Sequence, residues 1–411
     1  MNLDGWLTSR RLRAHALLLA IAVWGIYIWT IATPGLRDRN ENLKGTDFLH
    51  FYTLGSLALA HRGNELYDMR SQASLAAQRV PDARGIGYLP LYPPQVSVLF
   101  APLAVLSYEW ALALWWFCTA LIYGGCCYGI WRSCAALRNL GGTVALATLA
   151  FPAFYHLIAW GQTSAIALAC FTVAFFFLRE EREFAAGLVL GCLIFKPQLG
   201  LAAAVLFMFL RRWRLVAGAA LSAAAQISVG VLYYGTGPFR RWINIMWEVP
   251  TLLTSFEPKP YQTHCLRTFW SMLVPGTGLS LVLYAISGAV VLAWTIAIWK
   301  SRDSLSLKFS ALLLATVLVS PHLTVYDLEI LAPAILLLAD WTVSQNPIHE
   351  GTGSILYAVY ILPLLGPLTR WIHVQLSVIA MAVLLYWIRK ASEKEHAARV
   401  AGSEQVEGVN Q

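Results

Sequence analysis

Three residues could take part directly in a chemical reaction, because each has an ionisable side chain beside a long apolar run. Asp47 opens a stretch of helical spacing, so its carboxylate either caps that helix or serves as a general base. Lys196 lies between two apolar stretches, where an amine needs a partner or a water-filled pocket. It either snorkels to the interface or binds a lipid phosphate. His322, in a Ser-Pro-His turn before Tyr326 and Asp327, is either an interfacial residue or part of a catalytic group.

Further polar residues are candidates for holding a sugar and a phosphate. Tyr92 precedes two prolines that fix an extended backbone, and Gln162, in a Trp-Gly-Gln turn, could hydrogen-bond a sugar. Arg240, beside Arg241, either clamps a phosphate or meets lipid headgroups. With Lys196 these residues form the predicted donor site. The residues predicted to bind the acceptor are Glu65, Gln262 and His264.

The sequence lacks the motifs of common soluble enzymes. It contains no P-loop, no GxGxxG after a strand, and neither the GxSxG nor the HExxH motif. Its seven cysteines form no CxxC pair and no Cys/His spacing typical of zinc. We therefore predict no metal site and no bound cofactor.

The composition indicates a protein whose surface faces lipid. Of 411 residues, 58% are hydrophobic and 13% are charged, and the mean hydropathy is +0.59. A soluble domain has roughly 25% charged residues. The net charge of +8 comes largely from short clusters of Lys and Arg at the ends of apolar runs. That distribution is typical of membrane topology and contact with anionic headgroups, rather than of nucleic-acid binding.

Apolar segments recur along the chain and predict an all-α, polytopic membrane bundle of about 11 to 13 transmembrane helices in one domain, residues 1–390. The segments are 14–33, 95–106, 108–131, 142–158, 162–178, 185–195, 198–210, 214–234, 279–299, 308–320, 326–340, 354–368 and 372–388. The first lacks a following cleavage site, which predicts an uncleaved span rather than a signal peptide. Several later segments are shorter than the ~20 residues of a span, which favours helices surrounded by protein or a watery cavity.

The distribution of Lys and Arg predicts the orientation. If the N-terminus is cytoplasmic and 95–106 is a partial, re-entrant helix, nearly every basic connection lies inside. Both termini are then cytoplasmic in a multi-pass protein of the cell membrane, and 34–94 and 235–278 are outer loops. Residues 48–59 have the spacing of an amphipathic helix on the membrane surface. The tail, 391–411, mixes charges without aromatics and is predicted to be disordered.

The order of several short motifs resembles glycosyltransferase family 87, the polyprenol-phosphate-mannose-dependent mannosyltransferases with the GT-C membrane fold. The resemblance spans roughly Asp47 to Pro333. The matching segments are Asp47 with the helix after it, Glu65-Leu66-Tyr67-Asp68, Tyr92-Pro93-Pro94, Ala101-Pro102-Leu103-Ala104, Gly161-Gln162, Lys196-Pro197-Gln198 and Ser320-Pro321-His322. Each motif is short, so their order along the chain carries the resemblance.

The resemblance implies an enzyme that moves a sugar on the outer membrane face from a polyprenyl phosphate to a hydroxyl of a glycolipid or glycan, by an inverting single displacement. It implies Asp47 as catalytic base, His322 as a second catalytic or donor-binding group, and Lys196 as a cation beside the leaving phosphate. Two differences from the family pattern bear on the identity of the sugar and acceptor. They are Ser164, two residues after Gln162, and Tyr261-Gln262-Thr263 in the late loop.

Two other functions remain as alternatives. A transporter or flippase of lipid-linked sugars should distribute charges through the bilayer and contain paired broken helices, whereas here the charges gather at one face without an internal repeat. An O-antigen ligase or polymerase should carry its large outer loop late, whereas here the longest loop follows the first span. Both comparisons favour the transferase.

Overall fold

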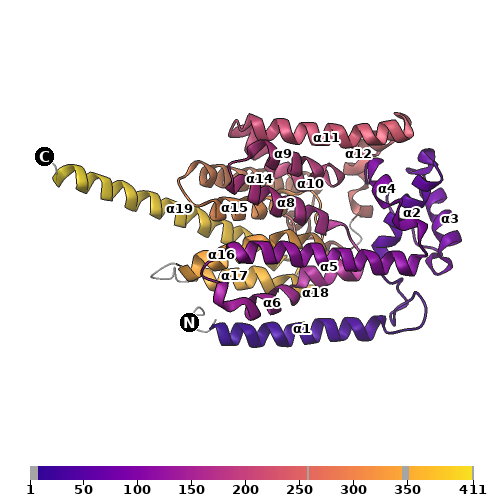
Figure 1. Ribbon diagram of the computed structural model, residues 1–411, viewed down its shortest axis with the longest axis horizontal. Coiled ribbons are helices and arrows are strands. Elements are labelled where there is room, and N and C mark those ends of the chain that lie inside the picture. Colours follow the sequence, from indigo (N-terminus) through magenta and orange to yellow (C-terminus); the bar gives the residue numbers. More distant parts are fainter. Residues whose placement is uncertain (1–7, 257–258, 345–350, 410–411) are drawn as a thin grey trace.

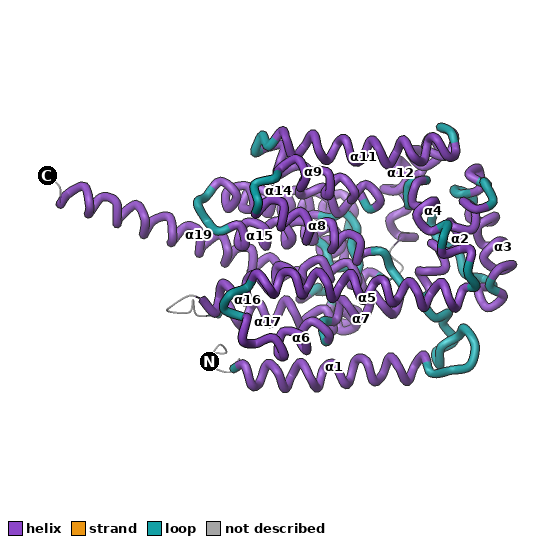
Figure 2. Tube along the Cα trace, viewed as in Figure 1, coloured by secondary structure: helices purple, strands orange, loops and turns teal. Residues whose placement is uncertain are grey.

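The computed structural model describes residues 8–256, 259–344 and 351–409, and for 249–256 and 394–409 it describes the backbone alone. Helices make up most of this chain, and no strand occurs within the described ranges (Figure 2). The predicted all-α membrane fold is therefore confirmed.

Five helical stretches in the described chain are long and apolar enough to cross a membrane. A helix of about 20 residues rises 30 Å, which matches the hydrocarbon thickness of a bilayer. These stretches are α1 (Ser9–Ile31), α5 (Tyr108–Ser133), α11 (Trp213–Tyr234), α14 (Thr277–Lys300) and Thr352–Ile372, which comprises α17 (Thr352–Ile361), η9 (Leu362–Leu365) and α18 (Gly366–Ile372). The protein is thus built as a multi-pass membrane protein. The described chain has five such stretches, or six with a bent one, where about 11 to 13 spans were predicted, because several of the predicted apolar segments form shorter helices.

A sixth stretch is bent, and the bend has a local cause. The apolar helices α6 (Gly141–Leu149) and α7 (Pro152–Trp160) meet at an angle of 46°. Pro152 is the first residue of α7, and Phe151 before it is extended, with ψ of 121°. A proline disfavours helical backbone in the residue that precedes it, so the first helix ends here and a new one starts.

Four further apolar helices are too short to cross alone, as several of the predicted segments are. They are α8 (Ser164–Arg179), α9 (Glu183–Gly191) with its continuation η6 (Cys192–Phe195), α10 (Pro197–Phe209) and α15 (Leu305–Val319). Every residue from Phe309 to Val319 is buried, so α15 is surrounded by protein. A short apolar helix of this kind is stable because its neighbours, rather than lipid, cover it.

The polar segment after α1 gathers at one end of the bundle. It contains α2 (Thr46–Leu59), α3 (Met69–Arg79) and α4 (Gln95–Phe100). Both chain ends that Figure 1 marks lie at the opposite end, and α1, α5 and α11 run along the length between them. This arrangement fits the predicted topology, in which the first outer loop lies across the membrane from both termini. Which face is cytoplasmic stays a prediction.

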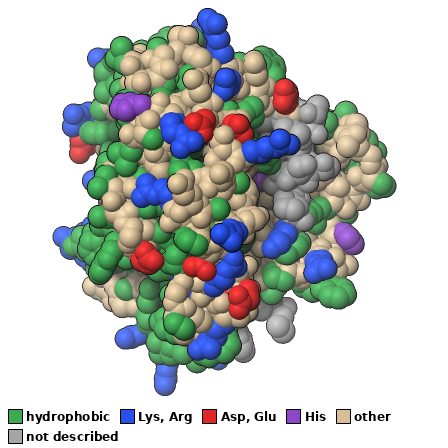
Figure 3. Space-filling model, turned by 90° about the vertical axis from the view of Figure 1, so that its right-hand side faces the viewer, with side chains coloured by type: hydrophobic (Ala, Val, Ile, Leu, Met, Phe, Trp, Pro, Cys, Tyr) green, Lys and Arg blue, Asp and Glu red, His purple; other side chains and the backbone are tan. Residues whose placement is uncertain are grey.

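The end that carries α2 to α4 is rich in charge. Figure 3 shows Lys, Arg, Asp and Glu side chains spread over this end, with hydrophobic side chains gathered towards its margins. Exposed ion pairs here join Arg37 to Asp82 at 3.8 Å and Arg62 to Glu65. A charged end with apolar sides is the distribution expected of a bundle that leaves the membrane at this end.

Helix α2 forms where it was predicted but does not lie on a surface. All residues from Phe48 to Ala58 are buried, because α3, α4, α5 and α7 pack around the helix. Gly55 allows α4 to approach, since a Cβ at this position would clash with the carbonyl oxygen of Phe100. The prediction of an amphipathic helix on the membrane surface is therefore corrected. The apolar spacing indicated one buried face, but the neighbouring helices bury the other faces of α2 as well.

The segment 95–106 does not contain a helix long enough to cross. The six residues of α4 rise about 9 Å. After Pro102 the chain continues as the short 3-10 turn η4 (Leu103–Val105), which also packs against α2. The segment is thus a partial helix at the α2 end of the bundle.

The remaining helices complete the bundle and its tail. They are α12 (Gly237–Phe256), α13 (Leu266–Leu273), α16 (Ala332–Ser344) and α19 (Leu376–Val409), with the short 3-10 turns η2 (Gly63–Glu65), η3 (Pro81–Ala83), η5 (Arg138–Leu140), η7 (Pro260–Gln262) and η8 (Val325–Leu331). Helix α19 extends out of the bundle and stays helical to Val409, whereas the tail from 391 was predicted to be disordered (Figure 1). Arg389 and Lys390 each lie 3.0 Å from Glu393, and such pairs stabilise a helix without tertiary packing. Residues 410–411 lie outside the described chain.

Candidate active site

Asp47 lies in the first turn of α2, and its carboxylate does not cap the helix. The N-cap position is held by Gly45, in the left-handed conformation with φ of 62°, and no side chain caps this end. The Asp47 Oδ2 atom instead accepts a hydrogen bond of 2.6 Å from Gln162 Nε2. The capping interpretation is therefore wrong, and the carboxylate makes a long-range tertiary contact.

A glycine allows the Gln162 turn to approach α2 this closely. Gly161 ends α7 in the left-handed conformation, with φ of 70°. A Cβ at this position would lie 2.7 Å from the Cβ of Phe48, one residue after Asp47. The Trp115 indole donates a 3.0 Å hydrogen bond to the Gly161 carbonyl oxygen and fixes the turn. The Trp-Gly-Gln sequence thereby places the Gln162 amide against the Asp47 carboxylate.

Gln162 connects the residues of the candidate site. Its Nε2 donates to Asp47, and its Oε1 lies 3.4 Å from both the Tyr92 hydroxyl and Lys196 Nζ, which donate to it. The backbone N–H of Thr163 donates to the same oxygen at 3.3 Å. Because the amide must offer N–H to a carboxylate and its oxygen to an amine, its orientation is determined.

Lys196 is buried and ion-paired. Its Nζ lies 2.8 Å from Asp327 Oδ1 and 3.0 Å from Ser164 Oγ, and the two side chains of the ion pair are each 5% exposed. Ser164 donates its own hydroxyl proton to the same Asp327 oxygen. With the contact to Gln162, these bonds use all three N–H donors of the lysine. Snorkelling is therefore wrong for this residue, and the partner that a lysine in an apolar run requires is Asp327.

Short structural motifs hold both members of the ion pair. Pro197 is the first residue of α10, and Lys196 before it is non-helical, with φ of −134° and ψ of 72°, at the helix start. On the other side, Asp327 Oδ2 accepts 3.2 Å hydrogen bonds from the N–H and hydroxyl of Thr324 in a capping box of η8. The site is thus assembled from α2, the turn between α7 and α8, the turn before α10, and η8.

The electrostatic setting favours a proton acceptor at Asp47. Burial raises the pKa of Asp47 to about 6, while the hydrogen bond from Gln162 and the charge of Lys196 act in the opposite direction. Since Asp327 neutralises Lys196, the ionised Asp47 carboxylate carries the net charge of this network. A carboxyl group that titrates near neutrality is well suited to general base chemistry.

His322 and His264 lie on segments that adjoin the network. The segment of His264 is joined to that of Thr324 by a backbone bridge between Thr263 and Thr324 and by the His264 N–H, which donates to Leu323. His264 is 1% exposed, and its Nδ1 lies 2.7 Å from the Ser377 hydroxyl. Burial lowers the pKa of His264 to about 3, so its ring is neutral.

The Ser-Pro-His turn also has a defined anchor. The Ser320 hydroxyl donates to the His322 carbonyl oxygen at 2.8 Å, and the Arg267 guanidinium donates to the Pro321 carbonyl oxygen. Arg267 was missing from the predicted site, although Leu266, Arg267 and Thr268 form the buried first turn of α13. The Ser-Pro-His turn lies next in sequence to Thr324 and thus to the Asp327 end of the network.

The other predicted binding residues lie outside the network. Glu65 pairs with Arg62 on the exposed surface of the first outer segment. Gln262 ends η7, where its N–H donates to the Lys259 carbonyl oxygen. Arg240 is exposed in the first turn of α12. The structure thus brings together Asp47, Tyr92, Gln162 and Lys196 but not these three residues.

Two members of the network were missing from the predicted site. Ser164 was considered as a difference from the family pattern, and Asp327 only as a neighbour of His322. The requirement of Lys196 for a counter-ion could have singled out Asp327, since few carboxylates lie within the apolar runs. No group of three or more His, Cys, Asp or Glu side chains that could hold a metal ion occurs in the described chain.

The comparison with protein families decides the class of the chain. The family model of glycosyltransferase family 87 matches residues 91–321, more than half of the 411 residues. The chain belongs to glycosyltransferase family 87. No curated protein and no solved structure matches it.

Membership of family 87 makes the chain a glycosyltransferase, and it needs a sugar donor and an acceptor in the membrane. The matched region includes Tyr92, Gln162 and Lys196, whereas Asp47 precedes it and Asp327 follows it. The network of this family 87 protein therefore joins the matched region to residues on both sides.

Proposed function

We propose that this glycosyltransferase transfers a hexose, with mannose as the expected sugar, from a polyprenyl phosphate to an acceptor hydroxyl on the outer face of the cell membrane. The observation that carries the proposal is the continuous hydrogen-bonded network from Asp47 through Gln162 to Lys196. It combines a carboxylate that titrates near neutrality with a buried cation, at the end of the bundle opposite both termini. A sugar bound to phosphate already has a good leaving group, so no nucleotide site is needed.

In the proposed reaction, Asp47 accepts the proton of the acceptor hydroxyl. The hydroxyl oxygen attacks the anomeric carbon while the bond from that carbon to the phosphate oxygen breaks, and polyprenyl phosphate leaves with the electron pair. The new glycosidic bond has the inverted configuration because the displacement is single. Positioning the two reactants and removing the proton are the contributions that the protein supplies.

Lys196 has a more specific role than the sequence indicated. Its charge is already balanced by Asp327 at 2.8 Å, and its longest contact is the 3.4 Å bond to Gln162 Oε1. We propose that an oxygen of the leaving phosphate replaces Gln162 as the third acceptor of this amine. The lysine then stabilises the growing charge of the phosphate from a fixed position.

The remaining predicted residues have supporting roles in this proposal. His322, on the turn next to Leu323 and Thr324, is the second polar group near the donor, and Tyr92 lines the donor side through its bond to Gln162. Arg240 is a phosphate or headgroup contact, while Glu65, Gln262 and His264 belong to the acceptor side. A ring nitrogen of His264, Nε2, is buried without a partner among the described atoms, which leaves it for a substrate hydroxyl.

The experiment that tests the proposal uses the purified full-length protein with polyprenyl-phosphate-mannose and a membrane lipid extract. Asp47→Asn should retain its fold and lose transfer, whereas Asp82→Asn, which alters an exposed carboxylate of the same outer segment, should be as active as the wild type. Full activity of Asp47→Asn would refute the base assignment. Movement of donor across vesicles without product would favour a flippase instead.

A further inference from the structure

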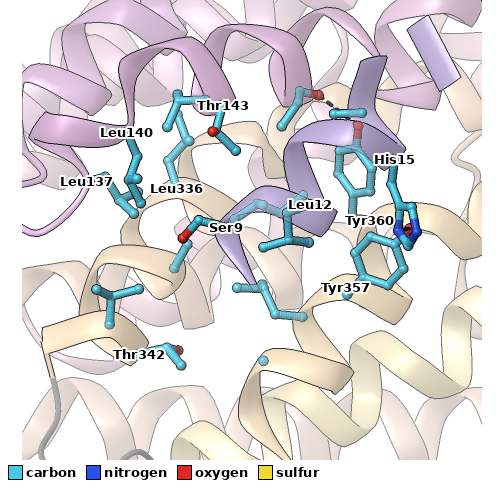
Figure 4. A pocket seen from close by; sticks show the side chains of 18 of the residues that line it. Ser9, Leu12, His15, Leu137, Leu140, Thr143, Leu336, Thr342, Tyr357 and Tyr360 are labelled. Carbon is cyan, nitrogen blue, oxygen red and sulfur yellow. Dashed lines mark hydrogen bonds between the residues drawn. The ribbon is translucent and has the colours of Figure 1, made fainter. Parts of the chain in front are cut away.

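A cavity lies far from the network of Asp47, Gln162 and Lys196, at the end of the bundle where both termini lie. Its volume is about 290 Å³, and it is bounded by α1, α6, α16 and α17. Figure 4 shows the side chains that line it, among them Leu12, Leu137, Leu140 and Leu336. The lining comes from four elements that are distant in sequence, so the cavity is a product of the tertiary fold.

The lining is almost wholly apolar. Its few polar groups are largely occupied: the Tyr360 hydroxyl donates to the Ala147 carbonyl oxygen at 2.8 Å, and the Tyr357 hydroxyl lies 3.4 Å from His15 Nδ1. Figure 4 shows the His15 and Tyr357 side chains next to each other. An apolar space of this kind does not hold ordered water, and within a bilayer its natural occupant is a hydrocarbon chain.

The cavity is not the site of the sugar donor's phosphate. Its lining residues on α1 run from Ser9 to Leu19, in the first half of the helix. Asp47 follows the other end of α1, and the residues from Leu19 to Ile31 rise about 18 Å. The cavity therefore lies in the half of the bundle next to the other membrane leaflet, which the topology predicts to be cytoplasmic.

Two arginines, Arg13 and Arg138, adjoin the lining at that end. Arg138 lies between the lining residues Leu137 and Leu140 in sequence. The Arg13 guanidinium reaches α6, because its Nη2 lies 3.8 Å from where a Cβ of Gly142 would be. Both arginines are exposed, and neither forms an ion pair with a carboxylate in the described part of the chain.

The carboxylate closest in sequence to the lining is otherwise engaged. Asp340 follows Ala339 of the lining, and its Oδ1 accepts hydrogen bonds from the backbone N–H groups of Ala136 and Leu137, at 2.7 and 3.2 Å. The rim thus has two arginines against one carboxylate, and so presents net positive charge beside an apolar space. A lipid with a negatively charged headgroup and a long acyl chain complements both features.

We propose that this cavity binds one anionic glycerophospholipid, with an acyl chain between α1, α6, α16 and α17 and the phosphate at Arg13 and Arg138. A zwitterionic lipid of the same chains fills the cavity equally well but is attracted less by the two arginines. A polyprenyl phosphate is a poorer fit, because its phosphate belongs at the opposite end of the bundle. The lipid site is thus separate from the proposed donor and acceptor sites, and only the exclusion of polyprenyl phosphate rests on the proposed function.

The test is a lipid titration of the purified, delipidated full-length protein, read by native mass spectrometry. Phosphatidylglycerol and phosphatidylcholine with identical acyl chains serve as the probes. One phosphatidylglycerol should bind at least fivefold more tightly than phosphatidylcholine. Arg13→Gln and Arg138→Gln should each weaken phosphatidylglycerol about fivefold, because a single arginine near the phosphate contributes about that factor. Arg214→Gln, an exposed arginine at the start of α11, is the matched control and should change nothing.

A second pair of variants tests the apolar part. Ala339→Phe places a ring in the cavity and should reduce retention of both lipids at least fivefold, whereas Ala217→Phe on the exposed side of α11 should not. Thermal unfolding checks that each variant folds. If Ala339→Phe does not fold, the variants of the exposed arginines still test the proposal. Equal binding of the two lipids, or equal losses in the variants and their controls, would overturn the proposal. So would polyprenyl phosphate that displaces phosphatidylglycerol one for one.

Discussion

Lys196 and Asp327 form an ion pair of 2.8 Å in which each side chain is 5% exposed, although 131 residues separate them. Asp47 is connected to this pair by one bridging residue, Gln162, which hydrogen-bonds to both Asp47 and Lys196. The ion pair therefore determines where the bridging amide lies, and the amide determines where the carboxylate of the proposed base lies. Four of the following predictions test these dependencies.

The first prediction concerns the stability of the pair. Asp327→Ala should destabilise the protein by about 3 to 5 kcal/mol, because it leaves the buried ammonium group of Lys196 without its counter-ion. The measurement is thermal or denaturant unfolding in detergent. The double variant Lys196→Met with Asp327→Leu should be more stable than Asp327→Ala, although inactive. If Asp327→Ala is as stable as the wild type, Lys196 and Asp327 do not form an ion pair in the native protein.

The second prediction concerns pH. Transfer requires the ionised form of Asp47, whose pKa is raised to about 6 by burial, so activity should increase as the pH rises through about 6 and then level off. Below that value, kcat/KM should fall about tenfold for each pH unit. Rates of transfer between pH 4.5 and 8 test this, with unfolding followed over the same range. A flat profile, or one that falls with rising pH through 6, would contradict a base of this pKa.

The third prediction concerns Gln162. Gln162→Ala removes a hydrogen bond to a charged carboxylate, so kcat should fall about 10- to 100-fold. Because that bond favours the ionised form, its loss should also move the acid limb of the pH profile to higher pH. Gln78→Ala, on the exposed side of α3, serves as the control and should match the wild type in both measurements. A purely structural role would lower the amount of folded protein without moving the limb.

The fourth prediction concerns Gly161. Its φ of 70° is costly for any residue with a Cβ, and that Cβ would lie 2.7 Å from Phe48 Cβ. Gly161→Ala should therefore cost about 1 to 3 kcal/mol of stability and separate Gln162 from Asp47, with a loss of activity beyond the loss of fold. Gly124→Ala, where nothing lies within 4 Å of the added Cβ, should be tolerated. Wild-type activity in a folded Gly161→Ala would show that α2 can move away without consequence.

The sequence predicted the elements well where the physics is local. Apolar runs located α1, α5, α11 and α14, since a span must bury about 20 consecutive residues in lipid. The helix after Asp47 was predicted from spacing alone. Its burial on all sides was not, because that depends on α3, α4 and α5, whose packing leaves no trace in the helix's own periodicity.

The candidate site was predictable only in part for the same reason. Asp47, Tyr92, Gln162 and Lys196 were named from their positions at the ends of apolar runs, and the fold brings them together. Asp327 was not assigned a role, because a single sequence does not reveal which of several distant carboxylates will meet a buried lysine. Glu65 was assigned from its place in a motif, and its ion pair with Arg62, three residues away, was not foreseen although pairing within one helical turn is common.

The distance along the chain between Lys196 and Asp327 also matters during biosynthesis. At typical rates of synthesis, a ribosome needs on the order of ten seconds to add the 131 residues that separate them. For much of that interval the lysine has emerged from the ribosome but its counter-ion does not yet exist, so the nascent chain carries an unbalanced ammonium group next to the hydrocarbon layer. Gln162 and Ser164 are made before the lysine and can hydrogen-bond to its ammonium group until Asp327 is made. A chain truncated before Asp327 should accordingly be recognised by quality-control proteases, however many helices it has already inserted.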